Sequence, residues 1–434
     1  MSIRKLGLTG RILIGMIAGG VVGAILNPWN IDGSMVNFLF IDGIFRVLGE
    51  FFITSLMMLV VPLVFFSLVV GTCSLSDPAS LGRLGGKAIS LYLATTAIAI
   101  SFALFIAGLI VKPGNGVGLE PPTEGAFDTS EAPSFVDVLV NMVPRNPIDA
   151  MAEGNMLQII VFALLFGIAM ALAGKPGERL KVVFDDVNEI IMKLVMLLMH
   201  VAPYGVFALM ARVFGDLAGG EILVGLAKYF FTVLGLLLFH GFIVYPTLLS
   251  ILARVNPLMF IRKMAGTQVF AFSISSSNAT IPVTLRTVRQ RLGVDNTVSS
   301  FTVPLGATIN MDGTAIMQGV ATVFIAQIYG IDLSIADYLM VVATATLASI
   351  GTAGVPGVGL IMLAMVLNQV GLPVEGIALI IGVDRLLDMT RTAVNITGDA
   401  MVSTVIGKSE GKLDETIYND PEAGLNVVAE EKSA

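Results

Sequence analysis

Residues 382–399 read Gly382-Val-Asp384-Arg385-Leu-Leu-Asp388-Met-Thr-Arg391-Thr392-Ala-Val-Asn395-Ile-Thr-Gly-Asp399, inside a hydrophobic segment from about Gly376 to Ile406. On a helix, at roughly 100° per residue, six of these side chains fall within an arc of roughly 100°. They are Asp384, Asp388, Arg391, Thr392, Asn395 and Asp399. Ionisable residues inside a membrane span cost about 2.5–3.5 kcal/mol each and usually mark a substrate or ion pathway. The segment is therefore predicted to be a membrane helix with one polar edge turned inward.

The composition of the whole chain indicates an integral membrane protein. Of its 434 residues, 55% are hydrophobic and only 13% are charged, and the mean hydropathy is +0.88. Apolar stretches long enough to cross roughly 30 Å of hydrocarbon recur at about 11–27, 44–71, 88–111, 155–174, 190–212, 227–253, 299–329 and 376–406. We expect an all-α fold with eight transmembrane helices.

Basic residues predict the orientation, because cytoplasmic loops carry an excess of Lys and Arg. When the spans are counted from a cytoplasmic N-terminus, each basic cluster falls on the cytoplasmic side: Arg4, Lys5 and Arg11; Arg83 and Lys87; Lys175, Arg179 and Lys181; Arg254, Arg262 and Lys263; Arg286, Arg289 and Arg291. The segment 113–135 carries acidic residues and no Lys or Arg, as an external loop could. Both termini are thus expected in the cytoplasm, and the acidic residues 409–434 are expected to form a disordered tail.

Two further apolar segments, 257–290 and 334–371, are interrupted at their centres by small polar residues and proline. The centres read Ser273-Ile-Ser-Ser-Ser-Asn-Ala-Thr-Ile-Pro282 and Ser349-Ile-Gly-Thr-Ala-Gly-Val-Pro-Gly-Val-Gly359. Backbone that leaves the helix at membrane depth needs protein or a water-filled cavity around it, and small residues let it approach a ligand. We expect two re-entrant hairpins; the alternative is a span merely kinked by its proline.

Each broken segment is followed, roughly thirty residues on, by a span with acid and amide groups. The first is followed by Asn310-Met-Asp312-Gly313-Thr314, and the second by the polar edge of residues 388–399. In the predicted orientation one hairpin enters from the cytoplasm and the other from outside. This is the pattern of an inverted repeat with a site at the membrane midplane.

The polar groups of this predicted core suit a hard cation, which takes oxygen ligands. Asp312, Asp384, Asp388 and Asp399 outnumber Arg385 and Arg391 by two charges if all are ionised. Bound cations or protonation would neutralise the excess equally well, so the count does not separate sodium from proton coupling. In the third span Tyr92, Thr95 and Thr96 share one helix face.

Resident metals and cofactors have little support in the sequence. Cys73 is the only cysteine, and the two histidines, His200 and His240, are far apart. A zinc or iron site would need more such ligands, so both histidines are expected to be packing residues. No cofactor is expected, and cations enter only as coupling ions.

Four motifs in this order resemble the dicarboxylate/amino acid:cation symporters, the glutamate transporter family. They are Ser275 to Thr284, Pro304 to Thr314, Ser349 to Gly357 and Asp388 to Asp399. The resemblance covers most of the chain after residue 40. It implies a homotrimer in the bacterial inner membrane, with eight spans and two hairpins per subunit and transport by an elevator motion. It also implies no enzymatic activity and no nucleic-acid partner.

The resemblance further implies a division of each subunit into a scaffold and a mobile transport domain. Residues 1–75 (spans 1 and 2) and 130–222 (spans 4 and 5) would form the scaffold. Residues 84–112 (span 3) and 223–408 (span 6, hairpin 1, span 7, hairpin 2 and span 8) would form the transport domain. Residues 409–434 would follow as the cytoplasmic tail.

By the same resemblance, the substrate is an acidic amino acid, glutamate or aspartate. Arg391 would pair with the side-chain carboxylate, Asp388 would hold the α-amino group, and Asn395 would take the α-carboxylate. A planar guanidinium suits a carboxylate in bidentate contact. The remaining contacts would come from Thr314 and Thr392 and from the hairpin residues Ser275, Ser276, Ser277, Val355, Gly357 and Gly359.

The matching sodium ligands form three implied sites. The first would use Gly306, Asn310, Asn395 and Asp399. The second would use Thr308, Ser349, Ile350 and Thr352, and the third Tyr92, Thr95, Thr96, Asn310 and Asp312. Asp399 is similar to sodium-coupled rather than proton-coupled members. Gln318 stands where eukaryotic relatives carry a glutamate linked to proton movement, so no proton co-transport is expected.

One departure from the family pattern concerns an arginine. Relatives carry it at the first hairpin tip or in span 8, whereas this chain has Ser275 and Met389 at the matching positions. Arg385 lies one turn before Met389, and its replacing the missing arginine is a hypothesis.

Three alternatives remain beside a sodium-coupled symporter of acidic amino acids. A proton-coupled C4-dicarboxylate symporter is the strongest. An intramembrane aspartyl protease using Asp312 and Asp388 lacks the Gly-x-Gly-Asp signature, and a nearby arginine would keep both carboxylates ionised. A pure anion channel would have no need of two gated hairpin tips.

Overall fold

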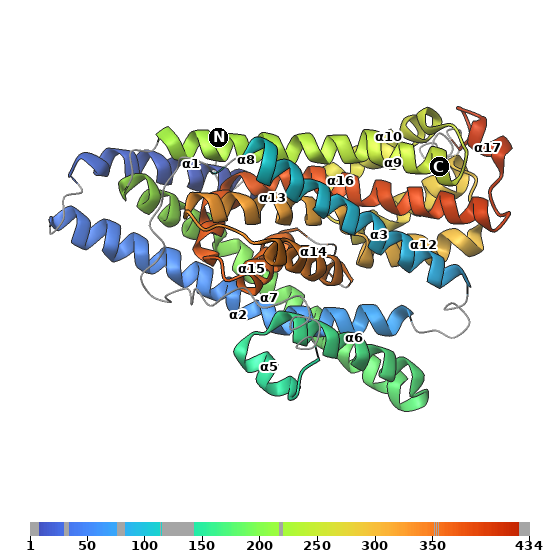
Figure 1. Cartoon of the computed structure of the whole chain (residues 1–434), viewed down its shortest axis with the longest axis horizontal. Helices are drawn as coiled ribbons and strands as arrows, with labels where there is room; N and C mark the ends of the chain where they lie inside the picture. Colours follow the sequence, from blue (N-terminus) through green and yellow to red (C-terminus); the bar gives the residue numbers. More distant parts are fainter. Residues whose placement is uncertain are drawn as a thin grey trace, which may run out of the picture.

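The computed structural model describes residues 8–29, 34–75, 83–112, 114, 143–216, 220–350, 352, 354 and 356–424. These residues fold almost entirely into helices, many of which run along the long axis of the molecule (Figure 1). The first half contains α1 (Leu8–Leu26), η2 (Asn27–Trp29), η3 (Asn37–Phe45), α2 (Arg46–Leu75), α3 (Arg83–Phe105), η4 (Ile106–Val111), α5 (Pro147–Glu153), α6 (Met156–Leu172) and α7 (Lys175–Asp216). The expected all-helical fold is confirmed for the described residues.

The second half supplies the broken helices. It contains α8 (Gly220–Phe239), η5 (His240–Val244), α9 (Tyr245–Leu252), α10 (Pro257–Ile274), α11 (Ser277–Arg286), η6 (Thr287–Arg291), α12 (Asn296–Ile309), α13 (Asp312–Ile328), α14 (Ile335–Ser349), α15 (Val358–Gln369), η7 (Val374–Gly376), α16 (Ile377–Ser409) and α17 (Glu415–Asn419). Each predicted span falls on one helix, on part of a longer helix, or on two or three consecutive helices.

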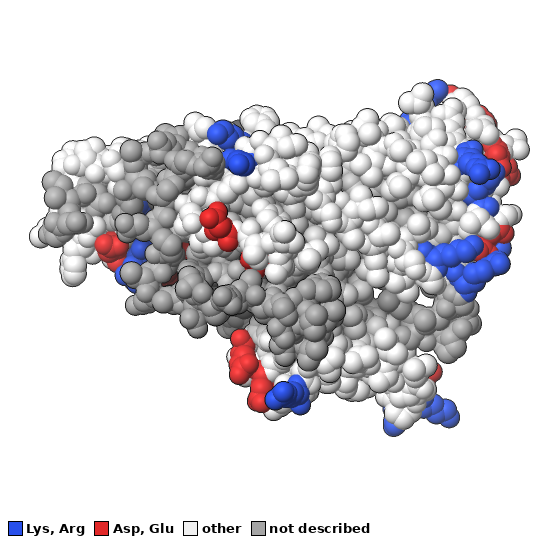
Figure 2. Space-filling view, in the orientation of Figure 1, with Lys and Arg blue, Asp and Glu red and all other residues white. Residues whose placement is uncertain are grey.

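Length and apolarity alone identify fewer complete spans than eight in the described part of the chain. Two helices qualify, Arg83–Val111 and Leu223–Leu252. A third is reached if Lys175–Val195 and His200–Arg212, which meet at 46°, form one bent span. Shorter apolar helices include Ile14–Trp29, Val61–Cys73 and Gln158–Leu172. On the visible face, charged side chains gather at the end where α17 lies and are scattered over the opposite half, with a broad zone free of visible charge between them (Figure 2).

The helices pack in two groups. One consists of α1, α2, α6 and α7, and the other of α3 and the helices from α8 to α16, with contacts between the groups mainly along α15 and α16. Glycines at positions 15, 19 and 23 of α1 lie so close to the α7 backbone that an added Cβ would collide with carbonyl oxygens of Pro203, Phe207 and Ala211. Small residues four apart allow this close approach of two helices.

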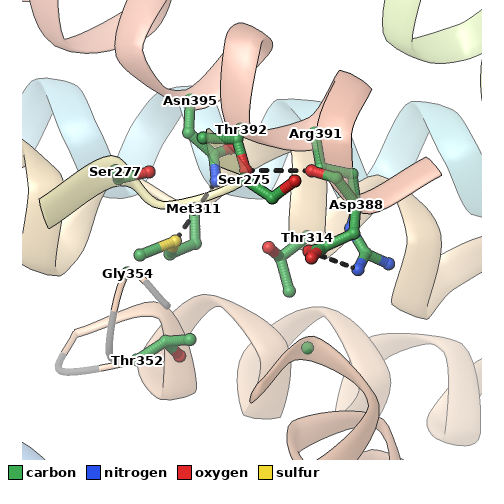
Figure 3. A pocket seen from close by; sticks show the side chains of 11 residues that line it. Ser275, Ser277, Met311, Thr314, Thr352, Gly354, Asp388, Arg391, Thr392 and Asn395 are labelled. Carbon is green, nitrogen blue, oxygen red and sulfur yellow. Dashed lines mark hydrogen bonds and ion pairs between the residues drawn. The ribbon is translucent and has the colours of Figure 1, made fainter. Parts of the chain in front are cut away.

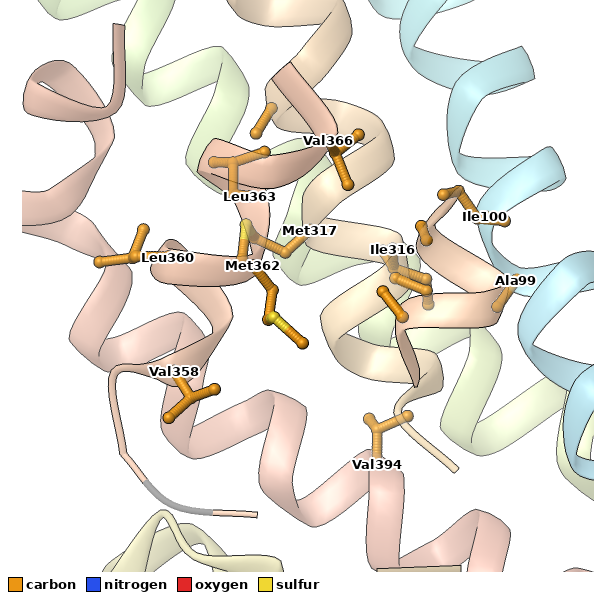
Figure 4. Close-up of a cluster of buried hydrophobic side chains, with 14 of the residues drawn as sticks. Ala99, Ile100, Ile316, Met317, Val358, Leu360, Met362, Leu363, Val366 and Val394 are labelled. Carbon is orange, nitrogen blue, oxygen red and sulfur yellow. The ribbon is translucent and has the colours of Figure 1, made fainter. Parts of the chain in front are cut away.

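A continuous apolar cluster runs through both groups and is the core of the second. Buried side chains of α3, α13, α15 and α16 meet in it (Figure 4), among them Ile100, Ile316, Met362 and Val394. This packing places α13 between α3 on one side and the α15–α16 pair on the other. The polar residues at the start of α13 are thereby held at the centre of the molecule.

Helix breaks occur where the polar interruptions predict them. The helix α10 ends at Ile274, and the next residue, Ser275, has a left-handed φ of 56°. The Ser276 hydroxyl caps α11 by accepting from the Ala279 N–H. The helices α14 and α15 are separated by residues 350–357. A further break lies inside the predicted span 299–329, where Asn310 and Met311 separate α12 from α13. The two broken hairpins are named hairpin 1 (residues 257–290) and hairpin 2 (residues 334–371) from here on.

The expectation of a disordered tail over 409–434 is wrong for residues 409–424. Tyr418 of α17 is fully buried, and its hydroxyl donates to the Asn256 carbonyl oxygen at 2.9 Å. Glu410 accepts from Lys87 and Arg83 at the start of α3, and these hydrogen bonds lower the pKa of its carboxyl. The acidic composition of this segment suggested that it is solvated. Its hydrogen-bond partners in α3 and at Asn256 are remote in sequence, so composition did not indicate them. Residues 425–434 lie outside the described part of the chain.

Candidate functional site

The tips of both hairpins meet α13 and α16 around a small polar pocket (Figure 3). Its lining consists of Ser275, Ser277, Met311, Thr314, Thr352, Gly354, Gly359, Asp388, Arg391, Thr392 and Asn395. The cavity measures about 20 Å³, enough for roughly one water molecule. Any larger ligand therefore requires the lining to move apart.

The Arg391 guanidinium is the centre of charge in this pocket. Only 1% of the residue is exposed, and its two terminal nitrogens donate to both Asp384 oxygens at 2.6 and 3.2 Å. One of them also donates to Asp388 Oδ1 at 2.8 Å. The buried Nε has no hydrogen-bond partner among the described residues. A buried donor left without an acceptor costs about 1–3 kcal/mol, so the site is suited to an anionic ligand atom.

The opposite side of the pocket is set by Asn395. Its side-chain oxygen accepts from the Gly313 N–H at 2.8 Å, and its amide nitrogen lies 3.2 Å from the Met311 sulfur. An added Cβ on Gly313 would lie 2.9 Å from the Arg391 Cα, so only glycine allows α13 to approach α16 this closely. The first N–H groups of a helix have no partner within the helix, and Asn395 satisfies one of them at the start of α13.

The two hairpin tips touch each other directly. The Ser276 hydroxyl donates to the Gly354 carbonyl oxygen at 2.7 Å, and the Asn278 N–H donates to the same oxygen at 3.2 Å. Ser275 stands in the left-handed region, at a cost of roughly 1–2 kcal/mol for a residue with a Cβ, and its buried hydroxyl has no partner in the described structure. Such strain is typical of functional sites.

The predicted substrate residues divide between the pocket lining and its surroundings. Ser275, Ser277, Thr314, Gly359, Asp388, Arg391, Thr392 and Asn395 line the pocket. Ser276 instead joins the tips, and Gly357, with a φ of 86°, begins α15 outside the lining. Val355 lies outside the described residues.

A first oxygen-rich cluster lies behind the pocket, between α12 and α16. The Asn310 amide donates to Asp399 Oδ1 at 2.9 Å and to the Asn395 carbonyl oxygen at 3.1 Å. An added Cβ on Gly306 would collide with the Asp399 carboxylate, so that carboxylate lies directly against the α12 backbone. The four residues predicted for the first sodium site are thus neighbours. The buried Asn310 Oδ1 is an acceptor without a donor among the described residues, as a cation ligand would be.

A second oxygen-rich cluster joins α3 to α13. The Thr96 hydroxyl lies 2.5 Å from Asp312 Oδ1 and 2.9 Å from the Tyr92 carbonyl oxygen, which Thr95 also contacts. Asp312 is fully buried. These residues belong to the predicted third site, and Asn310 adjoins them through the short link before α13. The cluster also includes His240 and Tyr245, which both lie against Asp312.

Among the described residues, one hydrogen bond joins members of the predicted second sodium site, from the Thr352 N–H to the Ser349 carbonyl oxygen at 3.4 Å. The hydroxyls of Thr308, Ser349 and Thr352 each donate to a carbonyl three or four residues earlier in their own segment, and the Ile350 N–H donates to the Leu347 oxygen. The tip of hairpin 2 nevertheless reaches α12, because an added Cβ on Gly354 would lie 3.1 Å from the Ala307 oxygen. The four residues therefore lie in adjoining segments.

Several residues of the site are not identified by the sequence. Asp384 enters the charge count but not the predicted site, although it forms the main ion pair of Arg391. Met311 and Gly354 line the pocket beside predicted residues. Both could have been predicted from the sequence, because Met311 follows Asn310 and Gly354 lies inside the tip of hairpin 2. His240, expected to be a packing residue, instead contacts a buried carboxylate.

Arg385 extends the ion-pair network. Its Nη1 lies 3.3 Å from Asp388 Oδ2, so Asp388 bridges Arg385 and Arg391. With Asp384 included, two arginines face two carboxylates in this network, of which Arg391 and Asp388 line the pocket. Asp312 and Asp399 are the excess negative charges, and both lie in the oxygen-rich clusters.

Comparisons with known proteins match the chain over nearly its full length. A family model described as the sodium:dicarboxylate symporter family matches residues 8–409. The "Proton/sodium-glutamate symport protein" of Geobacillus stearothermophilus is 34% identical over 421 residues, covering 95% of this chain and 96% of the relative. The "Proton/glutamate-aspartate symporter" of Escherichia coli (strain K12) is 36% identical over 427 residues, covering 94% of each. The human "Neutral amino acid transporter A" is 34% identical over 445 residues, covering 93% of this chain and 82% of the relative.

Proposed function

The chain belongs to the sodium:dicarboxylate symporter family, and we propose that it is a secondary active symporter that imports glutamate or aspartate together with sodium ions. The names of its relatives cover acidic and neutral amino acids, so the choice of substrate has to be argued from the residues of this pocket. It is a transporter rather than an enzyme.

The single observation that supports an acidic substrate is the buried Arg391 guanidinium, whose Nε has no hydrogen-bond partner among the described residues. A side-chain carboxylate of the substrate would accept from it in place of one of the aspartates. Asp388, released from Arg391, would then hold the α-ammonium group. The α-carboxylate would take the Asn395 amide, and Thr314, Thr392 and backbone at Ser275 to Ser277 and at 355–359 would complete the contacts.

Sodium as the coupling ion is supported by the two oxygen-rich clusters. Asp399 and Asp312 are buried carboxylates without a Lys or Arg in contact among the described residues. Gly306, Asn310, Asn395 and Asp399 would form one site, and Tyr92, Thr95, Thr96, Asn310 and Asp312 another. Thr308, Ser349, Ile350 and Thr352 would form a third site once hairpin 2 closes on α12. Hard cations take such oxygen ligands.

The proposed mechanism is an elevator motion of a transport domain against a scaffold. The scaffold would comprise residues 1–75 and 130–222, and the transport domain residues 84–112 and 223–408. The packing of α1, α2, α6 and α7 as one group supports this division. The tip of hairpin 2 would act as the outer gate. A cavity of about 20 Å³ admits no amino acid until its lining moves, and Thr352 and Gly354 of this tip belong to the lining.

The proposal extends to the whole assembly. Each subunit would have eight spans and two re-entrant hairpins, with both termini in the cytoplasm. Three subunits would form a homotrimer in the bacterial inner membrane.

Uptake of labelled aspartate into proteoliposomes tests this function. We expect uptake driven by an inward sodium gradient and lost when choline replaces sodium, even with a proton gradient imposed. Undiminished uptake in choline would refute sodium coupling.

The second candidate is proton-coupled transport of a C4-dicarboxylate. It is favoured by the same excess charge, since protonation would neutralise Asp312 and Asp399 as well as a cation would. Competition of labelled aspartate uptake by succinate separates the two. A substrate without an amino group gives Asp388 no ammonium partner in exchange for Arg391 and leaves it only the Arg385 contact, so succinate should compete poorly if the acidic amino acid is the substrate.

A further inference from the structure

We propose that Tyr245 and His240 are positioning residues for the coupling cation, which they serve by fixing the Asp312 carboxylate. The inference rests on the proposed function, because it needs a cation at Asp312. Neither residue belongs to the ligand set inferred for sodium above.

The carboxylate of Asp312 has two different sides. Its Oδ2 accepts from the Tyr245 hydroxyl at 2.8 Å and lies 3.3 Å from His240 Nε2. Its Oδ1 faces α3 and contacts the Thr96 hydroxyl at 2.5 Å. Asp312 is fully buried and 2% of His240 is exposed, so water does not replace these contacts. Because an ionised carboxylate only accepts, the histidine Nε2 is the donor in its pair.

A local distortion of the helix brings the two donors together. His240 to Val244 form the π-helix η5 between α8 and α9, and the Tyr245 N–H donates to the His240 carbonyl oxygen. This wider turn places residues five apart above one another, and the two rings lie 4.5 Å apart at 76°. In a regular α-helix these two side chains would point in different directions. Single π-turns of this kind frequently occur at functional sites.

The neighbouring helix makes room for the same arrangement. An added Cβ on Gly398 of α16 would lie 2.5 Å from the Tyr245 hydroxyl. The same Cβ would collide with the Asn310 amide, which contacts Asp399. A glycine at this position therefore lets Tyr245 approach both oxygen-rich clusters.

The two sides of the carboxylate have different chemical capacities. The Thr96 hydroxyl on Oδ1 can rotate and present its lone pairs to a cation. The donors on Oδ2 hold the plane of the carboxylate, so that Oδ1 points at the α3 hydroxyls before the cation arrives. Outer-shell partners of this kind typically change metal affinity 10- to 100-fold when they are removed.

Tyr245→Phe tests the proposal, with Tyr229→Phe as the matched control. Tyr229 is another fully buried tyrosine, in the adjoining helix α8, and its hydroxyl has no partner among the described residues. Sodium binding is measured by calorimetry on the purified full-length protein, with sodium chloride as titrant and choline chloride maintaining ionic strength. We expect Tyr245→Phe to weaken sodium binding about 10-fold or more and Tyr229→Phe to leave it unchanged. Aspartate affinity at saturating sodium should be the same in both variants.

A second pair of variants covers the histidine and guards against a general loss of folding. His240→Ala should weaken sodium binding, and His240→Gln, which keeps an amide N–H donor, should recover part of it. Equal sodium affinities in Tyr245→Phe and Tyr229→Phe, or in His240→Ala and His240→Gln, would overturn the positioning role. If the unmodified protein shows no sodium binding at all, the proposed sodium coupling fails instead.

Discussion

The buried guanidinium of Arg391 should set the choice between acidic and neutral substrates. Its terminal nitrogens contact Asp384 and Asp388, and its buried Nε has no hydrogen-bond partner among the described residues. Arg391→Cys should remove acidic-substrate binding, a loss on the order of 2–5 kcal/mol, and could admit a neutral amino acid. Equilibrium binding of aspartate and serine measures both effects.

The control for this change is Arg391→Lys. It keeps the positive charge but lacks the planar fork and the Nε donor, so we expect weakened but acidic-selective binding. Retained aspartate affinity in Arg391→Cys would contradict the role of the guanidinium.

Asp399 should act on the cation rather than on the amino acid. Its carboxylate lies between the Asn310 amide and the α12 backbone, away from the pocket lining. Asp399→Asn keeps the shape but removes the charge, so the sodium concentration for half-maximal binding should rise before thermal stability falls. A sodium titration that superimposes on that of the unmodified protein would exclude Asp399 as a ligand.

Among the elements, the C-terminal segment 410–424 clamps the base of hairpin 1. Lys263 of α10 is fully buried and donates to the Ile417 and Arg291 carbonyl oxygens at 2.6 and 2.5 Å. An isolated bridge joins Val294 to Leu413. The two arms of the hairpin are therefore held together at their outer ends by residues that follow α16.

Truncation of the central side chain of this clamp should destabilise hairpin 1. Tyr418→Ala removes a fully buried ring, and comparable losses of large aromatic side chains cost about 3–5 kcal/mol. Tyr418→Phe removes only the hydrogen bond to Asn256, at about 1 kcal/mol. Thermal unfolding and hydrogen exchange of residues 257–291 measure the difference. Equal stability of the two variants would show that the ring is not needed.

For the molecule as a whole, the elevator hypothesis requires α16 of the transport domain to move along α1 of the scaffold. An added Cβ on Gly382 of α16 would lie 3.3 Å from the Met16 Cβ, close to the roughly 3.5–4.5 Å that a disulfide requires. In a Cys73→Ser background, oxidised Met16→Cys/Gly382→Cys should bind aspartate but not transport it. Reduction should restore uptake in proteoliposomes.

A crosslink inside one group of helices is the matched control. An added Cβ on Gly319 of α13 would lie 3.4 Å from the Ala103 Cβ of α3, with no closer backbone atom. Oxidised Ala103→Cys/Gly319→Cys joins two helices of the proposed transport domain and should leave transport intact. Full uptake by the oxidised Met16→Cys/Gly382→Cys protein would contradict the motion of one group past the other.

The local sequence pattern was sufficient to predict most helices of this protein and the breaks in both hairpins. Apolar runs marked the helices, because a membrane span needs length and hydrophobicity before it needs partners. Polar interruptions marked the breaks at Ser275 and in residues 350–357, because small polar residues and glycine favour leaving the helix there. Helical periodicity predicted that one edge of α16 would be polar.

Tertiary structure alone decided which groups those polar residues meet. Periodicity says which side of a helix is polar, but not that Asp384 takes Arg391, that Ser276 reaches Gly354, or that His240 meets Asp312. The ordered segment 410–424 escaped prediction for the same reason, since its partners in α3 and α10 are remote in sequence. These contacts depend on how helices distant in the chain pack together, and the sequence of a single helix does not specify which helices it will contact.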